Sequence, residues 1–379
     1  MEKTERVVWV DWMRVLACLM VMVVHSAEPF YLGGDGSLIA NASDGYWVAF
    51  FDSFVRCCVP LFVIASSFLQ FPLHYPAKEF LRRRAARILI PFVIWSLFYA
   101  FYWGDSVSNL KGLLLNFNYA AGHLWFVYMI LGLYLLMPLL SPWAEKAGRK
   151  ELTAYICIWL FTTLIPLFRD WASGGQLAIT YGPTGIPRQA LFPLWGEACW
   201  NTYGTFYYLS GFVGYLLVGL WFRKFGSGIT AGKSLAAGIP CFIGGFAICF
   251  SGFLKRVSAT SGGIFPAAGP VNDAVYWETT WCYDSAGVAL MTIGTVLVLR
   301  IISSDGWVYR NVILPVSKAS YGMYLGHMVA LAFFAGLYRG LIPSTPLVIL
   351  ATAASSFTVS AIVAVLIRRI PVIGRYIIG

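Results

Sequence analysis

Residues 7–31 read VVWVDWMRVLACLMVMVVHSAEPFY, an apolar stretch long enough to cross a membrane. It contains Asp11, Arg14 and His25, although ionisable side chains are costly in lipid and those found there are usually functional. In an α-helix, the step from Arg14 to His25 returns to within about 20° of the same face and rises about 16 Å. The stretch therefore predicts a membrane helix with a cation near one surface and an imidazole toward the other.

The whole chain has the composition of a polytopic membrane protein. Its 379 residues are 59% hydrophobic and only 12% charged, and the apolar runs are too long and numerous for a soluble core. We expect an all-α transmembrane helical bundle with about ten spans, near residues 7–31, 46–71, 88–104, 121–143, 152–171, 203–222, 234–254, 275–299, 311–338 and 346–367. The short span 88–104 and the span that contains Pro166 could be broken or tilted.

Positive charges set the expected orientation, because short loops rich in Lys and Arg stay cytoplasmic. With the N-terminus inside, eighteen Lys and Arg residues fall on inner segments, six on outer segments and three within spans. Both termini are therefore predicted to be cytoplasmic. The net charge of +10 is then an orientation signal rather than evidence for a nucleic-acid partner.

The chain shows no internal repeat and no long soluble segment, which favours a single transmembrane domain over residues 1–379. We expect long outer connections at 172–202 and 255–274 and a basic inner loop at 72–87. No cleavable leader is expected, because the first stretch lacks a small-residue cleavage pattern. No His, Cys, Asp or Glu cluster has metal-ligand spacing, so no metal is expected.

The basic segment KEFLRRRAARILIPF, residues 78–92, contains a second candidate site. Arg84 and Arg87 are three residues apart, so on a helix they would present two guanidinium groups to one anion. A phosphate-rich ligand would fit this pair. The simpler alternative is a positive-inside segment beside anionic lipid, and the segment taken alone favours it.

Other ionisable residues within the predicted spans have structural alternatives. Asp52 and Arg56 are four residues apart and predict an ion pair between neighbouring helical turns. Glu28 follows His25 by about one turn, so it could orient the imidazole or simply be solvated. His123 and His327 could line a cavity, although hydrogen-bonded packing is the usual role of such residues.

Five motifs occur together along the chain. They are VDWMRVLACLMVMVVH with Asp11, Arg14 and His25, PLFVIASSFL at 60–69, RAARILIP at 84–91, GHLWFVYMILGLYLLMP at 122–138 and SKASYGMYLGH at 317–327. With these motifs the chain resembles the acyltransferase-3 family of integral membrane O-acyltransferases, in the stand-alone transmembrane form that modifies surface polysaccharides. Ser67 departs from the pattern, in which a Gly is usual, and no outer hydrolase-like domain follows the last span.

The resemblance implies transfer of an acyl group, expected to be acetyl, from cytoplasmic acyl-CoA to a hydroxyl of a surface or lipid-linked glycan. It places the protein in a bacterial cytoplasmic (inner) membrane, in contact with membrane lipid. Arg84, Arg87 and Arg14 would bind the CoA phosphates, with Arg14 restrained by Asp11. His25 would act as general base, or alternatively as a covalent acyl carrier, with Glu28 beside it. Further candidates for the substrate cavity are Ser66, His123, Trp125, Tyr321, Tyr324 and His327.

A competing interpretation is a secondary transporter or exporter of a lipid-linked or small polar substrate. It would also need many spans and intramembrane charges, and would use His25 as a proton relay. The missing repeat halves and the five-motif resemblance argue against it. Binding of acyl-CoA would distinguish the two classes, because a transporter does not require that ligand.

Overall fold

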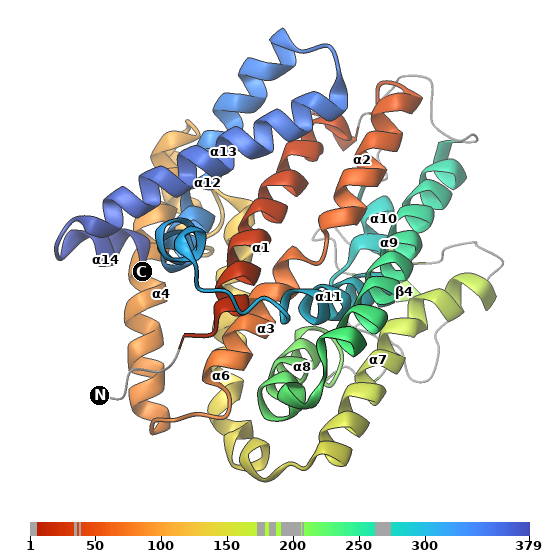
Figure 1. Ribbon diagram of the computed structural model, residues 1–379. Helices are drawn as coiled ribbons and strands as arrows, with labels where there is room; N and C mark the ends of the chain where they lie inside the picture. Colours follow the sequence, from red (N-terminus) through yellow and green to blue (C-terminus); the bar gives the residue numbers. More distant parts are fainter. Residues whose placement is uncertain are drawn as a thin grey trace. The chain divides into compact units, whose positions relative to one another are not determined.

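A computed structural model describes residues 6–33, 36–37, 39–172, 179–181, 187–190, 206, 208–261 and 274–379. Nearly all of this described chain is helical (Figure 1). Besides turns and loops, the described residues form two antiparallel pairs of very short strands: β1 (Leu32–Gly33) with β2 (Gly36–Ser37), and β3 (Ile179–Tyr181) with β4 (Pro187–Ala190). The predicted all-α helical bundle is confirmed.

Nine segments of the described chain are helical, long and apolar enough to cross a membrane. They are Val8–Phe30, Ala42–Gln70, Ala77–Tyr102, Gly122–Lys146, Arg149–Phe168, Ala231–Ala259, Thr279–Leu299, Tyr309–Leu341 and Thr345–Arg369. These correspond to nine of the ten predicted spans. The remaining one, predicted at 203–222, overlaps helix α8 (Phe212–Phe225), which has 14 residues. Residues 203–205 and 207 of that predicted span lie outside the described residues.

The chain forms two compact units, and each unit combines segments that are distant in sequence. Unit 1 consists of Met1–Met22, Gln70–Lys146 and Ile302–Gly379. Unit 2 consists of Val23–Leu69 and Ala147–Ile301. Helix α1 (Val8–Ala27) contributes residues to both units.

Unit 1 is built around long helices that come from three separate stretches of the chain. Its elements after α1 are α4 (Ala77–Tyr102), α5 (Ser106–Leu113), the short 3-10 helix η2 (Gly122–Leu124), α6 (Trp125–Lys146), the π-helical turn η5 (Tyr309–Ile313), α12 (Leu314–Leu341), α13 (Thr345–Arg369) and α14 (Ile373–Ile378). Helix α14 packs beside α4, α12 and α13 (Figure 1). Its Ile378 is buried against Gly322 of α12, where any Cβ would collide with the isoleucine side chain.

Unit 2 contains the remaining helices. They are the 3-10 turn η1 (Glu28–Phe30), α2 (Ala42–Val55), α3 (Cys58–Gln70), α7 (Arg149–Ala172), α8 (Phe212–Phe225), η3 (Gly226–Gly228), α9 (Ala231–Ser261), α10 (Ala274–Glu278), η4 (Thr279–Trp281) and α11 (Ala286–Leu299). Helices α9 and α11 approach closely because glycines face each other: a Cβ on Gly245 would lie 2.4 Å from the Gly287 carbonyl oxygen. Small residues permit such close packing of membrane helices.

Two loop predictions need correction. The segment predicted as a basic inner loop at 72–87 is helical from Ala77, because its Ala, Leu, Lys, Glu and Arg residues are strong helix formers. The connection predicted at 255–274 starts later, because α9 continues to Ser261; residues 262–273 lie outside the described residues. Most of the connection predicted at 172–202 also lies outside them.

The prolines inside spans do not interrupt their helices. Helix α4 continues through Pro91, so the short predicted span 88–104 is the second half of a longer helix, and α7 continues through Pro166. In lipid, neighbouring groups and local adjustment satisfy the backbone that a proline frees, so a helix remains the favoured conformation. By contrast, the predicted span 46–71 is two helices, α2 and α3, separated at Arg56 and Cys57.

Candidate functional site

The first cluster of predicted residues lies in unit 1, where the start of α1 meets α12. The Asp11 side chain is buried, with 6% of the residue exposed. The Tyr309 hydroxyl donates to Asp11 Oδ2 over 2.8 Å, the Ser317 hydroxyl donates to Oδ1, and Arg6 Nη1 lies 3.4 Å from Oδ2. Both oxygens of this buried carboxylate are therefore satisfied, as burial of a charge requires.

The guanidinium of Arg14 also bonds to helix α12, but to a different serine than Asp11 does. Its Nη2 donates to Ser320 Oγ over 2.9 Å. Ser317 and Ser320 are three residues apart on α12 and so share one face. Within the described part of the chain, Asp11 and Arg14 form no ion pair with each other, so α12 supplies the restraint that we had expected from Asp11.

Arg84 and Arg87 lie on α4 in the same unit. Neither has a carboxylate partner among the described residues, whereas the neighbouring Arg83 pairs with Glu79. Arg84 is half-buried, its guanidinium lies 5.5 Å from the Phe80 ring centre, and its buried Nε makes no hydrogen bond within the described structure. An arginine left incompletely bonded in this way is available to an anionic ligand.

Four of the predicted cavity residues come together on unit 1. The rings of His123 and His327 meet edge to face with centroids 5.0 Å apart, and His327 is fully buried. Tyr324 donates to the His123 carbonyl over 2.6 Å and stacks against Tyr321. Tyr321 in turn donates to the Ile88 carbonyl on α4, one residue after Arg87.

The other two predicted cavity residues occupy different places. Trp125 begins α6 and is 36% exposed. Ser66 lies on α3, in unit 2, and is half-buried.

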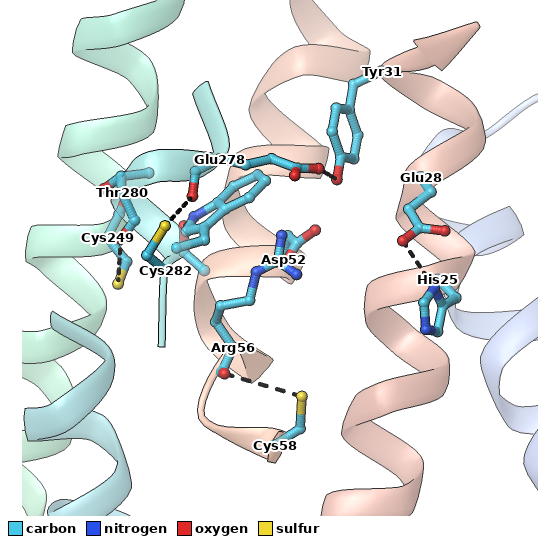
Figure 2. A network of polar contacts seen from close by, with 12 residues as sticks. His25, Glu28, Tyr31, Asp52, Arg56, Cys58, Cys249, Glu278, Thr280 and Cys282 are labelled. Atoms are coloured by element: carbon cyan, nitrogen blue, oxygen red, sulfur yellow. Dashed lines mark hydrogen bonds and ion pairs between the residues drawn. The ribbon is translucent and has the colours of Figure 1, made fainter. Parts of the chain in front are cut away.

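The second cluster contains His25 and lies in unit 2 (Figure 2). Helix α1 ends at Ala27. Glu28 is the first residue of the 3-10 turn that follows, and Pro29 is the second. This change of helix type still keeps the carboxylate beside the imidazole: Glu28 Oε1 lies 2.8 Å from His25 Nδ1. Of the two alternatives for Glu28, the structure shows a contact with the imidazole rather than a carboxylate surrounded only by solvent; that this contact orients His25 stays a prediction.

A buried polar network accompanies this pair on α2 and α10. The predicted Asp52–Arg56 ion pair is confirmed, with Asp52 Oδ1 3.0 Å from Arg56 Nε (Figure 2). The Arg56 guanidinium lies over the Trp281 ring, 4.8 Å from the ring centre. Tyr31 donates to Glu278 over 2.6 Å. Sequence reasoning missed Tyr31 and Glu278, because nothing local connects residues 247 positions apart.

The departure at Ser67 has a counterpart in the structure. Ser67 is fully buried and donates to the Leu216 carbonyl on α8. A Cβ placed on Gly219, one turn further along α8, would lie 2.6 Å from Ser67 Cβ. Gly219 therefore provides the space that the serine side chain occupies.

Clusters of ionisable residues within the spans of a polytopic helical bundle are typical of membrane enzymes and transporters. The family model described as an Acyltransferase domain matches residues 7–365, nearly the whole chain. The chain belongs to the acyltransferase-3 family and is an integral membrane acyltransferase. No curated protein and no solved structure matches it.

Proposed function

We propose that this acyltransferase moves an acyl group, most simply acetyl, from cytoplasmic acyl-CoA to a hydroxyl of a surface or lipid-linked glycan. The observation that carries the proposal is the His25–Glu28 pair at the end of α1, in a chain that belongs to a family of acyltransferases. An imidazole oriented by a carboxylate is suited to accept a proton from a hydroxyl. Family membership also removes most of the support for a transporter.

In the proposed step His25 acts as general base. The Nδ1–H of His25 donates a hydrogen bond to Glu28, which leaves Nε2 as the acceptor nitrogen of the neutral imidazole, and Nε2 takes the hydroxyl proton of the glycan. The glycan oxygen then attacks the thioester carbonyl, the new ester bond forms as the C–S bond breaks, and the proton on Nε2 passes to the departing CoA thiolate. A covalent acyl-His25 intermediate is the alternative, in which Nε2 attacks first.

The donor site in this proposal is the basic end of unit 1. Arg84 and Arg87 have no carboxylate partners in the described structure and would form charge-assisted hydrogen bonds with CoA phosphates. Arg14, bonded to the neutral Ser320, also keeps its positive charge uncompensated by a direct ion pair. The glycan acceptor and the bacterial inner membrane rest on the family resemblance and on the predicted topology.

Purified protein in detergent, incubated with radiolabelled acetyl-CoA, tests the proposed donor. We expect wild type to bind acetyl-CoA saturably and to release CoA slowly. The His25→Ala variant should still bind acetyl-CoA but should no longer release CoA. Absence of saturable acetyl-CoA binding to well-folded wild-type protein would contradict the proposal.

A further inference from the structure

The turn that carries Glu28 has little local structure of its own to hold it. η1 is only three residues long, all of them half-buried, and the backbone N–H of Tyr31 donates to the Glu28 carbonyl over 3.1 Å. A single 3-10 turn has poor hydrogen-bond geometry, so its position depends on contacts with the rest of the protein. Contacts beyond the turn therefore decide how firmly Glu28 is held.

Tyr31, the residue that follows the turn, makes such contacts. Its side chain is fully buried. Its ring meets the Trp281 ring edge to face with centroids 5.9 Å apart, and the Phe253 ring with centroids 6.3 Å apart. Its hydroxyl donates to Glu278 Oε1 over 2.6 Å (Figure 2). Because hydrogen bonds to a carboxylate are shorter and stronger than neutral ones, this bond ties the end of the turn to α10.

The aromatic platform beside Tyr31 is itself held by two further helices of unit 2. Trp281 is buried and stacks on Phe253 of α9 with ring centroids 4.2 Å apart. Its indole N–H donates to Ser53 Oγ on α2 over 2.9 Å, and the Arg56 guanidinium of the same region lies 4.8 Å from its ring centre. Movement of Tyr31 away from this platform would lose buried aromatic contacts and leave its hydroxyl without an acceptor, which is costly.

The other end of the turn is partly open. The exposed fraction is 20% for the His25 side chain and 29% for the Glu28 side chain, whereas Tyr31 is fully buried. A buried anchor thus lies three residues after an accessible carboxylate. This arrangement suits a site in which one group does the chemistry while packing and hydrogen bonds behind it fix its position.

We propose that Tyr31 and Glu278 are positioning residues for acyl transfer: their hydrogen bond fixes the end of η1 and so keeps the Glu28 carboxylate on His25 Nδ1. This inference rests on the proposed function, because it takes His25 as the base. Neither positioning residue contacts a substrate in this proposal, so acyl-CoA affinity should not depend on them. Their effect on rate should be no larger than that of the Glu28 carboxylate through which they act.

Release of CoA from acetyl-CoA by purified full chain in detergent tests the inference without an identified glycan, because water can act as the acceptor. His25 takes a proton from water, and the oxygen attacks the thioester carbonyl. The C–S bond then breaks, acetic acid forms, and the proton passes from His25 to the CoA thiolate.

Tyr31→Phe removes the hydroxyl and keeps the ring. We expect kcat for CoA release to fall about threefold to tenfold, within the loss expected for Glu28→Gln, with acetyl-CoA affinity unchanged. Tyr338→Phe is the matched control, because it also removes a tyrosine hydroxyl bonded to a side chain, here Ser355 Oγ over 2.9 Å. The control should keep the wild-type kcat.

A double substitution separates positioning from a general loss of structure. In Glu28→Ala no carboxylate remains to be positioned, so adding Tyr31→Phe should lower kcat no further, whereas independent damage would add to the first loss. Glu278→Gln is the conservative variant, since its amide oxygen can still accept the Tyr31 hydroxyl. It should retain more activity than Glu278→Ala, which should lose at least as much as Tyr31→Phe.

Three results would overturn the inference. Wild-type kcat in Tyr31→Phe would show that the bond does not position Glu28, while leaving His25 as the proposed base. A further loss on adding Tyr31→Phe to Glu28→Ala would show that Tyr31 does not act through Glu28. Acetyl-CoA affinity that falls in step with kcat would show a structural role only. If wild type releases no CoA, or His25→Ala releases it at the wild-type rate, the proposed function fails, and this inference fails with it.

Discussion

Glu28 Oε1 lies 2.8 Å from His25 Nδ1, across the point where α1 ends and a 3-10 turn begins. Glu28→Gln would keep an oxygen acceptor at this place but remove its charge. Because a hydrogen bond to a charged group contributes about 1 kcal/mol more than a neutral one, we expect kcat for acyl transfer to fall roughly fivefold to tenfold. Acetyl-CoA affinity should not change. An unaltered kcat in Glu28→Gln would show that the contact does not assist catalysis; Asp44→Asn, on the exposed start of α2, serves as control.

His25→Ala tests the proposed base itself. General acid–base catalysis contributes about 10²- to 10⁴-fold, so we expect at least this loss of acyl transfer with CoA binding nearly intact. The measurement is steady-state transfer together with equilibrium binding of acetyl-CoA. Turnover retained by this variant would exclude His25 from the chemistry.

Direct transfer and a covalent intermediate differ in what accumulates without an acceptor. If the glycan hydroxyl attacks the thioester directly, wild type incubated with radiolabelled acetyl-CoA and then denatured should carry no label on the protein. Label that is present in wild type and missing in His25→Ala would establish the acyl-histidine route instead.

The buried carboxylate of Asp11 predicts a stability effect. Tyr309→Phe removes a hydroxyl that donates to Asp11 over 2.8 Å, and loss of a hydrogen bond to a charged group costs about 1.5–3 kcal/mol. We expect a lower thermal unfolding midpoint in detergent. Tyr119→Phe, at an exposed tyrosine, is the control, and equal midpoints for the two variants would show that the Tyr309 bond does not stabilise unit 1.

Substitutions at Ser67 and Gly219 test whether the two residues compete for the same space. Gly219→Ala places a Cβ 2.6 Å from Ser67 Cβ and should destabilise the protein by about 1–3 kcal/mol, as overpacking of a core does. Removing the serine side chain in Ser67→Gly/Gly219→Ala should recover part of this loss; the Ile64 carbonyl, at 2.9 Å, limits the recovery. Additive effects of the two substitutions in thermal unfolding would show that the side chains do not compete for space.

The sequence predicted best what depends on local pattern. Apolar length located the spans, and helical spacing predicted the Asp52–Arg56 pair. The partners of Asp11 and Arg14 were not predicted, because Ser317 and Ser320 approach them only through the packing of α1 against α12. The motif SKASYGMYLGH contains both serines, three residues apart. Their spacing predicts that they share one face of a helix, but it does not indicate which other helix that face contacts.

The loop errors have a different origin. High charge was taken to mark a connection at 72–87, yet those residues are also strong helix formers, and α4 includes them from Ala77 onward. For the proposed donor site this difference matters, because Arg84 and Arg87 then project from a continuous helix. A rigid element holds two guanidinium groups in fixed positions more accurately than a loop does.

Calorimetry of CoA binding to Arg84→Gln/Arg87→Gln tests the central claim most directly. The matched control is Arg82→Gln/Arg83→Gln, which removes the same charge from the same helix at exposed positions. If the arginine pair binds CoA phosphates, each lost bond should cost about 1.5–3 kcal/mol, or roughly ten- to hundredfold in affinity per residue, while pantetheine binding and the control remain as in wild type. Unchanged CoA affinity in correctly folded Arg84→Gln/Arg87→Gln would contradict the account.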